Sequence, residues 1–298
     1  MGKRERVASE NPGVARGEGV ATVRHVPFAM KSVPAPSLFS SHGILIGGIL
    51  LLSAALIGCG KQSVVSAETL HYELVATYSH DVQAFTQGLL FHEGKLYEST
   101  GGYGRSTLRR VDPESGRAEE VRFLPDSIFG EGLALRDGEL YQLEWTSGIG
   151  RIYDLETLRK TGEFQYEGQG WGLTFDGEHF ILSDGSSRLR FYEPEEFRLV
   201  RTLVVTDENG EIDELNELEF IDGEVFANRW YDDEIVRIDP ESGRVTGRLS
   251  VVNLQRPRPA DPDAVANGIA WDPENRLLYV TGKRWPNLYV LRLVEAAP

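Results

Sequence analysis

The sequence has very little cysteine and no long hydrophobic run. Cys59 is the only cysteine among 298 residues, which excludes an intramolecular disulfide and a cysteine-ligated metal site. The apolar stretch Gly43 to Gly58 carries no charge but is too short for a comfortable membrane-spanning helix. Its length suits the apolar region of a signal peptide, so the sequence predicts export.

Basic residues are also scarce. The chain has 31 Lys and Arg against 46 Asp and Glu, a formal net charge of −15. Such a chain is a poor candidate for binding phosphate backbones, so we expect no nucleic-acid partner. The negative charge could attract substrates with a free amino terminus, but ordinary solubility explains it as well.

Two common catalytic patterns are absent from the sequence. The six histidines show no H-x-x-x-H spacing, and no serine lies in a G-x-S-x-G elbow. A zinc hydrolase and nucleophilic Ser or Cys catalysis are therefore disfavoured. Carboxylate acid–base chemistry remains.

The single cysteine stands at an informative position. Leu56-Ile57-Gly58-Cys59 resembles a bacterial lipobox, in which the peptide is cut before the cysteine and the thiol is lipidated. The alternative is a plain signal peptide with an incidental cysteine. We predict a leader over residues 1–58, with Met30 as an alternative start, and a lipidated tether over 59–70. The protein would then be anchored to a membrane on its periplasmic side.

A five-fold repeat runs through the rest of the chain. Each unit has an X-Gly-Leu/Ile step, an apolar strand, a turn and an apolar-aromatic strand, and the units are 40 to 50 residues apart. The steps are Gln87-Gly88-Leu89, Glu131-Gly132-Leu133, Trp171-Gly172-Leu173, Glu217-Leu218-Glu219 and Asn267-Gly268-Ile269. The turns are Glu93-Gly94, Asp137-Gly138, Asp176-Gly177, Asp222-Gly223 and Asp272-Pro273.

This period predicts an all-β, five-bladed β-propeller over residues 71–298. The fifth unit has no outer strand of its own, and an unpaired strand, Tyr72–Tyr78, precedes the first unit. We expect the N-terminal strand to pair with the last blade and close the ring, which removes an exposed sheet edge. A β-sandwich is the competing fold, but it gives no reason for five aligned units.

Two sets of equivalent positions mark a candidate site. The first residue of each step is polar or charged in four of the five units, which predicts a ring that faces a channel or pocket. A second set follows the second strands: Gly101, Trp145, Gly185, Trp230 and Lys283. This set is typical of an aromatic cup with one cation. The alternatives are tryptophans that pack between blades and a solvated surface lysine.

Nine segments of the chain form a set that runs in order through every blade. They are Phe85-Thr86-Gln87-Gly88-Leu89, Tyr97-Glu98-Ser99-Thr100-Gly101, Phe129-Gly130-Glu131-Gly132-Leu133, Gly170-Trp171-Gly172-Leu173, Ser183-Asp184-Gly185-Ser186, Leu215-Asn216-Glu217-Leu218-Glu219, Ala227-Asn228-Arg229-Trp230, Asn267-Gly268-Ile269-Ala270-Trp271 and Thr281-Gly282-Lys283-Arg284-Trp285-Pro286. Together they resemble the signature stretches of plant-type and bacterial glutaminyl-peptide cyclotransferases, and the resemblance runs from about Tyr72 to Leu293.

The resemblance implies a five-bladed propeller enzyme, an ammonia-releasing acyltransferase that converts the N-terminal glutamine of peptides or proteins to pyroglutamate. By motif, the catalytic carboxylate falls on Glu131. The other pocket residues fall on Phe85, Gln87, Phe129, Trp145, Trp171, Asn216, Trp230 and Lys283. No cofactor is implied for catalysis. Some family members carry a calcium ion in the central channel, so the resemblance allows a structural calcium ion here, which no motif of this sequence predicts independently.

The residue types suit this chemistry. A carboxylate can take a proton from the attacking amine and give one to the leaving nitrogen, which is the role predicted for Glu131. Asn216 and Lys283 are the predicted donors to the oxyanion. We expect a monomer. Two alternatives remain: a non-catalytic periplasmic propeller that binds partners, and a metal-dependent propeller hydrolase such as a lactonase, with Glu131, Glu217 and Asn267 among its ligands.

Overall fold

The computed structural model describes residues 66–256 and 260–294. All 22 regular elements in these residues are β-strands, which confirms the predicted all-β class. No helix that could cross a membrane is found in the described part of the chain. The predicted leader and the predicted lipidation site Cys59 lie outside it. The first strand begins at Glu68, so residues 68–70, which we assigned to the tether, belong to the sheet.

Three sheets each consist of four consecutive antiparallel strands. The first contains β2 (Thr86–His92), β3 (Lys95–Thr100), β4 (Thr107–Asp112) and β5 (Arg117–Phe123). The second contains β6 (Gly130–Arg136), β7 (Glu139–Glu144), β8 (Ile149–Asp154) and β9 (Lys160–Gln165). The third contains β10 (Leu173–Phe175), β11 (Phe180–Leu182), β12 (Arg188–Glu193) and β13 (Arg198–Val204).

The fourth sheet has eight strands in the order β16-β17-β18-β19-β1-β22-β21-β20. The strand β1 pairs in parallel with β19 over Glu68–Leu70 and antiparallel with β22 over His71–Ser79. The strands of this sheet are β1 (Glu68–Ser79), β16 (Leu215–Ile221), β17 (Glu224–Arg229), β18 (Glu234–Ile238), β19 (Val245–Ser250), β20 (Ala266–Asp272), β21 (Leu277–Gly282) and β22 (Asn287–Val294). A short hairpin of β14 (Thr206–Asp207) and β15 (Gly210–Glu211) was not predicted.

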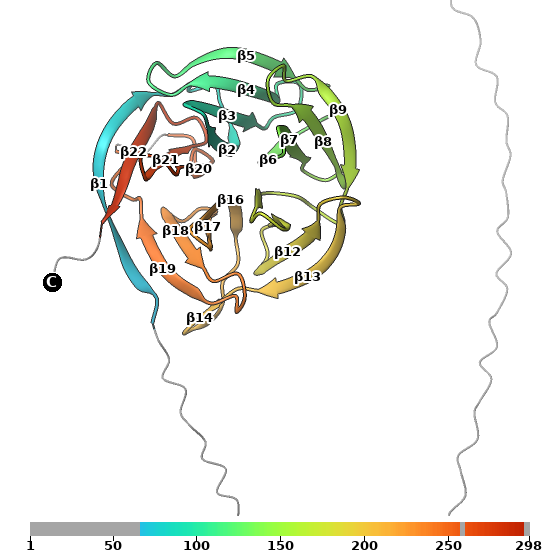
Figure 1. Ribbon diagram of the computed structural model, residues 1–298. Helices are drawn as coiled ribbons and strands as arrows, with labels where there is room; N and C mark the ends of the chain where they lie inside the picture. The colour runs from blue at the N-terminus through green and yellow to red at the C-terminus, as the bar shows by residue number, and fades with distance from the viewer. Residues whose placement is uncertain (1–65, 257–259, 295–298) are drawn as a thin grey trace, which may run out of the picture. The chain divides into compact units, whose positions relative to one another are not determined.

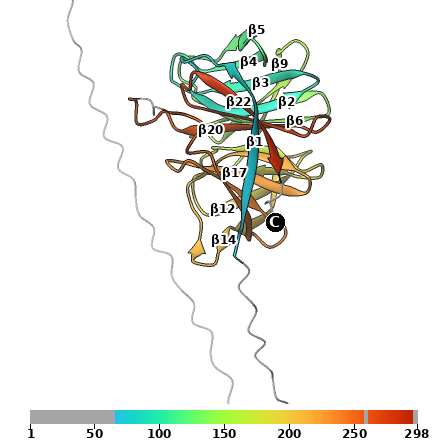
Figure 2. The ribbon, with the colours of Figure 1, turned by 90° about the vertical axis from the view of Figure 1, so that its left-hand side faces the viewer.

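The sheets are arranged around a centre (Figure 1). The strands β2, β6, β16 and β20 lie toward this centre, and β5, β9, β13 and β19 lie at the outside. Figure 2 looks at the side of the molecule along which β1 runs. The polar first residues of the repeated steps are carried by the inner strands, so this arrangement brings them toward one another.

Small residues allow the inner strands to approach closely. A Cβ added at Gly88 would lie 2.6 Å from the backbone nitrogen of Leu133, and one at Gly132 would lie 2.5 Å from that of Leu173. Real Cβ atoms do not come so close to backbone. The glycines of the repeated steps therefore allow neighbouring inner strands to lie in contact.

The turns at the opposite ends of the inner strands also match the sequence pattern. Both residues of Asp137-Gly138 have positive φ angles, 51° and 78°. Both residues of Glu93-Gly94 and both residues of Asp222-Gly223 also have positive φ angles. Two consecutive positive φ angles are the signature of the tight turns that favour Asp-Gly and Asn-Gly. At Asp176-Gly177 only the glycine is in this region.

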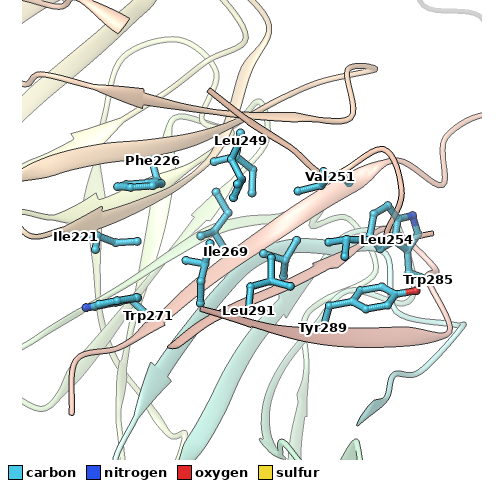
Figure 3. Close-up of a cluster of buried hydrophobic side chains, with 14 residues drawn as sticks. Ile221, Phe226, Leu249, Val251, Leu254, Ile269, Trp271, Trp285, Tyr289 and Leu291 are labelled. Atoms are coloured by element: carbon cyan, nitrogen blue, oxygen red, sulfur yellow. The ribbon is translucent and has the colours of Figure 1, made fainter. Parts of the chain in front are cut away.

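Apolar side chains fill the space between neighbouring sheets. One cluster joins residues of β16 to β19 with residues of β20 to β22, and Figure 3 shows its side chains, among them Ile221, Phe226, Leu249, Ile269 and Leu291. Another joins β6 and β7 to β10 and β11 through Tyr141 and Phe180, whose ring centroids are 4.5 Å apart. This packing fixes the angle at which each inner strand meets the centre.

Candidate active site

The polar ring that we predicted splits into two functionally different groups. Gln87, Glu131 and Trp171 line a cavity of about 370 Å³. Glu217 does not line it: its two carboxylate oxygens accept the backbone N–H groups of Leu89 and Ile269, at 3.2 and 2.7 Å. The expectation that the whole ring faces a pocket is therefore wrong for this residue, because its oxygens connect inner strands.

Asn267 is the other ring residue outside the cavity, and it supports the site from behind. Its Nδ2 donates to the backbone oxygen of Thr86 at 2.9 Å and to Oε1 of Gln87 at 3.1 Å. The side-chain nitrogen of Gln87 in turn donates to Oε1 of Glu131 at 3.0 Å. The amide of Gln87 is thereby fixed with its donor toward the carboxylate.

All nine residues that the sequence assigned to the site line this one cavity. Two residues that it did not assign complete the lining. The full set is Phe85, Gln87, Phe129, Glu131, Trp145, Trp171, Asn216, Trp230, Tyr231, Asp263 and Lys283.

The aromatic side chains and Lys283 form a continuous belt. Phe129 packs against Phe85 and against Trp145, with ring centroids 6.2 and 5.4 Å apart. The indole nitrogens of Trp145 and Trp171 both donate to Oε1 of Gln169, at 3.0 and 3.1 Å.

The other half of the belt contains the cation. Trp171 meets Trp230 edge to face at 5.1 Å. The ammonium nitrogen of Lys283 lies 5.5 Å from the ring centroid of Trp230 and 5.0 Å from that of Phe85, distances at which cations and ring faces attract. The belt thus returns to Phe85, and the solvated-lysine alternative does not hold because Lys283 is buried.

Two glycines make room for the belt. A Cβ at Gly101 would lie 2.1 Å from Cε1 of Phe129, and one at Gly185 would lie 2.6 Å from Cη2 of Trp171. Gly185 also has a φ of 81°, which side-chain-bearing residues rarely adopt. These glycines occupy the same repeat positions as Trp145, Trp230 and Lys283. At this position each unit therefore supplies either a side chain that lines the cavity or the space that a neighbouring ring needs.

Glu131 and Lys283 are both buried in the cavity, with 4% of each exposed. Burial raises the pKa of Glu131 well above its ordinary value, and the positive charge of Lys283 opposes this only in part. Burial lowers the pKa of Lys283 to about 8, against the opposing charges of Glu131 and Asp263. Both groups are therefore poised to exchange protons nearer to neutral pH than in water.

The cavity wall also holds polar atoms that have no hydrogen-bond partner among the described residues. They are Oδ1 of Asn216 and Nε1 of Trp230, both buried. Buried polar groups are costly unless they are paired, and both of these residues line the cavity. These two atoms add one acceptor and one donor to the carboxylate of Glu131 and the ammonium group of Lys283 in the cavity.

Comparison with known proteins identifies the family of the chain. The family model described as glutamine cyclotransferase matches residues 49–293. The chain belongs to this family. The activity of this family is the conversion of N-terminal glutamine to pyroglutamate, so the protein is an enzyme.

Two relatives of the cyclotransferase chain are informative. A glutaminyl-peptide cyclotransferase of Arabidopsis thaliana is 38% identical over 266 residues, which cover 85% of this chain and 82% of that protein. The crystal structure of Myxococcus xanthus glutaminyl cyclase superimposes with a TM-score of 0.73 at 35% identity, covering 78% of this chain and 100% of that one.

Three residues of the cyclotransferase site escaped the sequence reasoning. Gln169 holds two indoles, and Tyr231 and Asp263 lie at the cavity. Gln169 and Asp263 lie in loops between repeats, and Tyr231 stands at a position where the other units carry Gly102, Thr146, Ser186 and Arg284, which share no side-chain chemistry with it. Repeat alignment cannot find such positions.

The residues present do not form an evident metal site for the cyclotransferase fold. In residues 66–256 and 260–294, no three His, Cys, Asp or Glu side chains come together to hold an ion. Both oxygens of Glu217 accept backbone N–H groups, whereas Asn267 donates its nitrogen to Gln87 and keeps an Oδ1 with no hydrogen-bond partner among the described residues. The structural calcium ion that the resemblance allows stays a prediction.

Proposed function

We propose that Glu131 performs both proton transfers by which this enzyme closes N-terminal glutamine into pyroglutamate. The observation that carries the proposal is its position. The carboxyl group is buried in an aromatic cavity, its Oε1 is held by Gln87, and the one cation of the belt, Lys283, lies in the same cavity. A carboxyl group whose pKa is raised by burial can accept and return a proton near neutral pH.

The reaction then balances within one substrate molecule. The α-amino nitrogen attacks the side-chain amide carbon, a carbon–nitrogen bond forms, and Glu131 takes a proton from that nitrogen. The tetrahedral intermediate carries its negative charge on the former amide oxygen. When the bond to the amide nitrogen breaks, Glu131 returns the proton to it and ammonia leaves.

Three side chains are placed to stabilise the intermediate. Lys283 supplies a positive charge for the oxyanion, and the Nε1–H of Trp230 and the amide N–H of Asn216 supply hydrogen bonds. The unpaired Oδ1 of Asn216 can accept an N–H of the substrate, which a purely oxyanion-binding role would leave unexplained.

The aromatic belt supplies orientation. Because nucleophile and carbonyl belong to the same residue, folding the glutamine side chain back on itself replaces an encounter between molecules. The walls of Phe85, Phe129, Trp145, Trp171 and Trp230 exclude water from this folded form.

Glu131→Gln tests the proposal. The variant should keep its circular dichroism spectrum and melting temperature but lose ammonia release from a Gln-initiated peptide, measured by mass spectrometry. Glu114→Gln, an exposed residue on a turn, is the matched control and should retain wild-type turnover. Wild-type activity of Glu131→Gln would show that ring closure does not need this carboxylate. The cavity could then still serve to bind the substrate.

We also infer that the sheets form a five-bladed propeller closed by the N-terminal strand. Three sheets of four strands support three blades, and the eight-stranded sheet divides into two further sets of four where β1 meets β19. The antiparallel pairing of β1 with β22 supplies the outer strand that the last repeat lacks. A closed ring of this kind can act as a monomer, and gel filtration with light scattering tests that state.

Lipid anchoring at Cys59 on the periplasmic side is proposed from the sequence alone. The lipobox-like segment and the apolar stretch before it are its support. Cys59→Ser should move the protein from the membrane fraction to the soluble fraction of cells that express it. An unchanged distribution would refute the anchor.

A further inference from the structure

Tyr231 and Asp263 meet at the cavity although they come from different loops. Tyr231 follows β17, and Asp263 precedes β20. The hydroxyl of Tyr231 donates to Oδ1 of Asp263 at 3.1 Å, and both residues line the cavity that holds Glu131. Both are exposed, so they lie where the cavity opens to solvent.

The backbone at Tyr231 is strained. Its φ is 64°, a conformation that bulky residues rarely adopt. The ring is 54% exposed and stacks on Trp230 with a centroid separation of 4.3 Å. The strain therefore buries no extra apolar surface in the core. It holds an aromatic ring at the opening of the site, with its hydroxyl toward Asp263.

A second cavity of about 130 Å³ adjoins the first at Tyr231, which lines both. The loop of residues 261–265 also contributes to both cavities. The second cavity contains the carboxylates of Asp233 and Asp261, and Arg284 forms an ion pair with Asp261. Asp263 itself, at the border of the first cavity, is exposed, and its negative charge acts on the neighbouring Lys283.

The first cavity is larger than a single glutamine requires. Its volume lies within the range of roughly 300–1,000 Å³ that holds drug-sized ligands, whereas a glutamine residue has few atoms. A substrate whose first residue is bound at Glu131 must leave the cavity through its opening. The following residue then passes Tyr231 and Asp263.

We propose that Tyr231 and Asp263 form a subsite for the residue that follows the N-terminal glutamine, and that this subsite favours a lysine or arginine side chain directed toward the second cavity. The proposal rests on glutamine ring closure at Glu131. The ring of Tyr231 supports the aliphatic part of the side chain, and the exposed carboxylate of Asp263 attracts its charge.

Three otherwise identical peptides that begin Gln-Lys, Gln-Ala and Gln-Glu test the subsite. The kcat/KM for ammonia release should be about three- to tenfold higher for Gln-Lys than for Gln-Glu, as expected for charges that remain exposed to water. Raising the salt concentration should shrink this ratio. Asp263→Asn should bring the three peptides closer together.

The ratio separates specificity from catalysis. Because Asp263 also raises the pKa of Lys283, its replacement can change turnover of all three peptides, but that change is common to them and cancels in the ratio. Asp137→Asn is the matched control. Asp137 lies in the turn that follows β6, at the end of this strand opposite to Glu131, so its replacement removes the same charge as Asp263→Asn. Asparagine also suits this turn. It should leave the ratio unchanged.

Two results overturn the proposal. Equal kcat/KM for the three peptides would remove the subsite while leaving ring closure intact. A lysine preference that survives in Asp263→Asn would place its cause elsewhere. If wild-type enzyme cyclises none of the peptides, the proposed chemistry at Glu131 fails, and the subsite fails with it.

Discussion

At the scale of single residues, the site depends on a buried acid and a buried base that share one cavity. Lys283 has a pKa of about 8 because it is buried, and Glu131 has a raised pKa for the same reason. Glu131 can act as a base only above its pKa, where it is ionised, and Lys283 carries its positive charge only below its own pKa. Activity should therefore fall at low pH, as Glu131 gains a proton, and fall again above about pH 8, as Lys283 loses one.

Lys283→Arg isolates the alkaline limb, because an arginine side chain stays charged throughout this range. We expect lower activity at neutral pH, since the larger group fits the belt poorly. The ratio of variant to wild-type kcat/KM should rise above about pH 8. Ionisation of the substrate amine affects both enzymes alike and cancels in the ratio. Parallel pH profiles would show that the charge of Lys283 is not required.

Trp230→Phe tests the unpaired indole nitrogen. Phenylalanine keeps an aromatic ring beside Trp171 and Lys283 but removes the buried N–H donor. Loss of one hydrogen bond to the intermediate should lower kcat/KM roughly ten- to hundredfold. Trp271→Phe, outside the cavity, controls for the loss of an indole and should change stability without this loss of turnover. Unchanged kcat/KM in Trp230→Phe would assign the residue to packing only.

The sequence was most informative where a residue's role is repeated. Glu131, Trp171 and Lys283 could be found because each occupies a position that recurs in every unit, and recurrence exposes the unusual residue. Tyr231 could not be found in this way, since its equivalents in the other units share no side-chain chemistry with it and its partner Asp263 is 32 residues away. Glu217 was misread because a buried carboxylate can be satisfied by backbone N–H groups, which sequence does not show.

At the scale of elements, a buried polar network ties the first sheet to the loop that carries Lys283. Glu98 on β3 accepts from the Nε and Nη2 groups of Arg109 on β4, at 3.1 and 2.6 Å, and from Thr86 on β2 at 2.7 Å. His80 lies 3.0 Å from the same carboxylate, and its other ring nitrogen lies 2.7 Å from the backbone oxygen of Trp285. Two acceptors require two N–H groups, so this ring is an imidazolium.

The network should stabilise the fold in a defined pH range. Burial raises the pKa of Glu98, but the charges of Arg109 and His80 outweigh it and lower the pKa to about 2. A carboxyl group with a lowered folded pKa contributes stability above its unfolded pKa and loses it as pH falls toward 2. Glu98→Gln should therefore reduce the unfolding free energy by about 3 kcal/mol near neutral pH.

Urea unfolding of Glu98→Gln and wild type between pH 2 and 7 measures this effect. The difference between the two proteins should shrink as pH falls from about 4.5 to about 2. Glu114→Gln, on an exposed turn, should match wild type throughout. A difference that does not change with pH would mean that the stability comes from shape rather than from charge.

The elements themselves were largely predictable, because strand alternation and turn chemistry are local. The turns at Asp137-Gly138 and Asp222-Gly223 have the predicted positive φ angles. The β14–β15 hairpin was missed because it adds two-residue strands to a loop, too short for any alternation. The start of β1 at Glu68 was missed because three polar-flanked residues pair in parallel with β19, a partner far away in the sequence.

At the scale of the whole molecule, β1 connects the first part of the described chain to its last sheet. It pairs with both β19 and β22, and it brings Leu70 and Tyr72 against the apolar cluster between β16–β19 and β20–β22. Without β1, the outer edges of β19 and β22 would each expose unpaired backbone groups. Such edges promote aggregation.

Truncation measures the contribution of β1 directly. A chain of residues 66–298 retains β1 and should have the melting temperature and kcat/KM of the longer chain, because the proposed catalytic residues and their supports all lie after residue 66. A chain of residues 80–298 lacks only β1 and the two residues before it by comparison. We expect it to aggregate or to melt at a much lower temperature, since both the edge pairing and the contacts of Leu70 and Tyr72 are lost. Light scattering and circular dichroism distinguish these outcomes. A monomeric, active 80–298 chain would show that the last sheet is complete without β1, which the proposed closure of the ring does not allow.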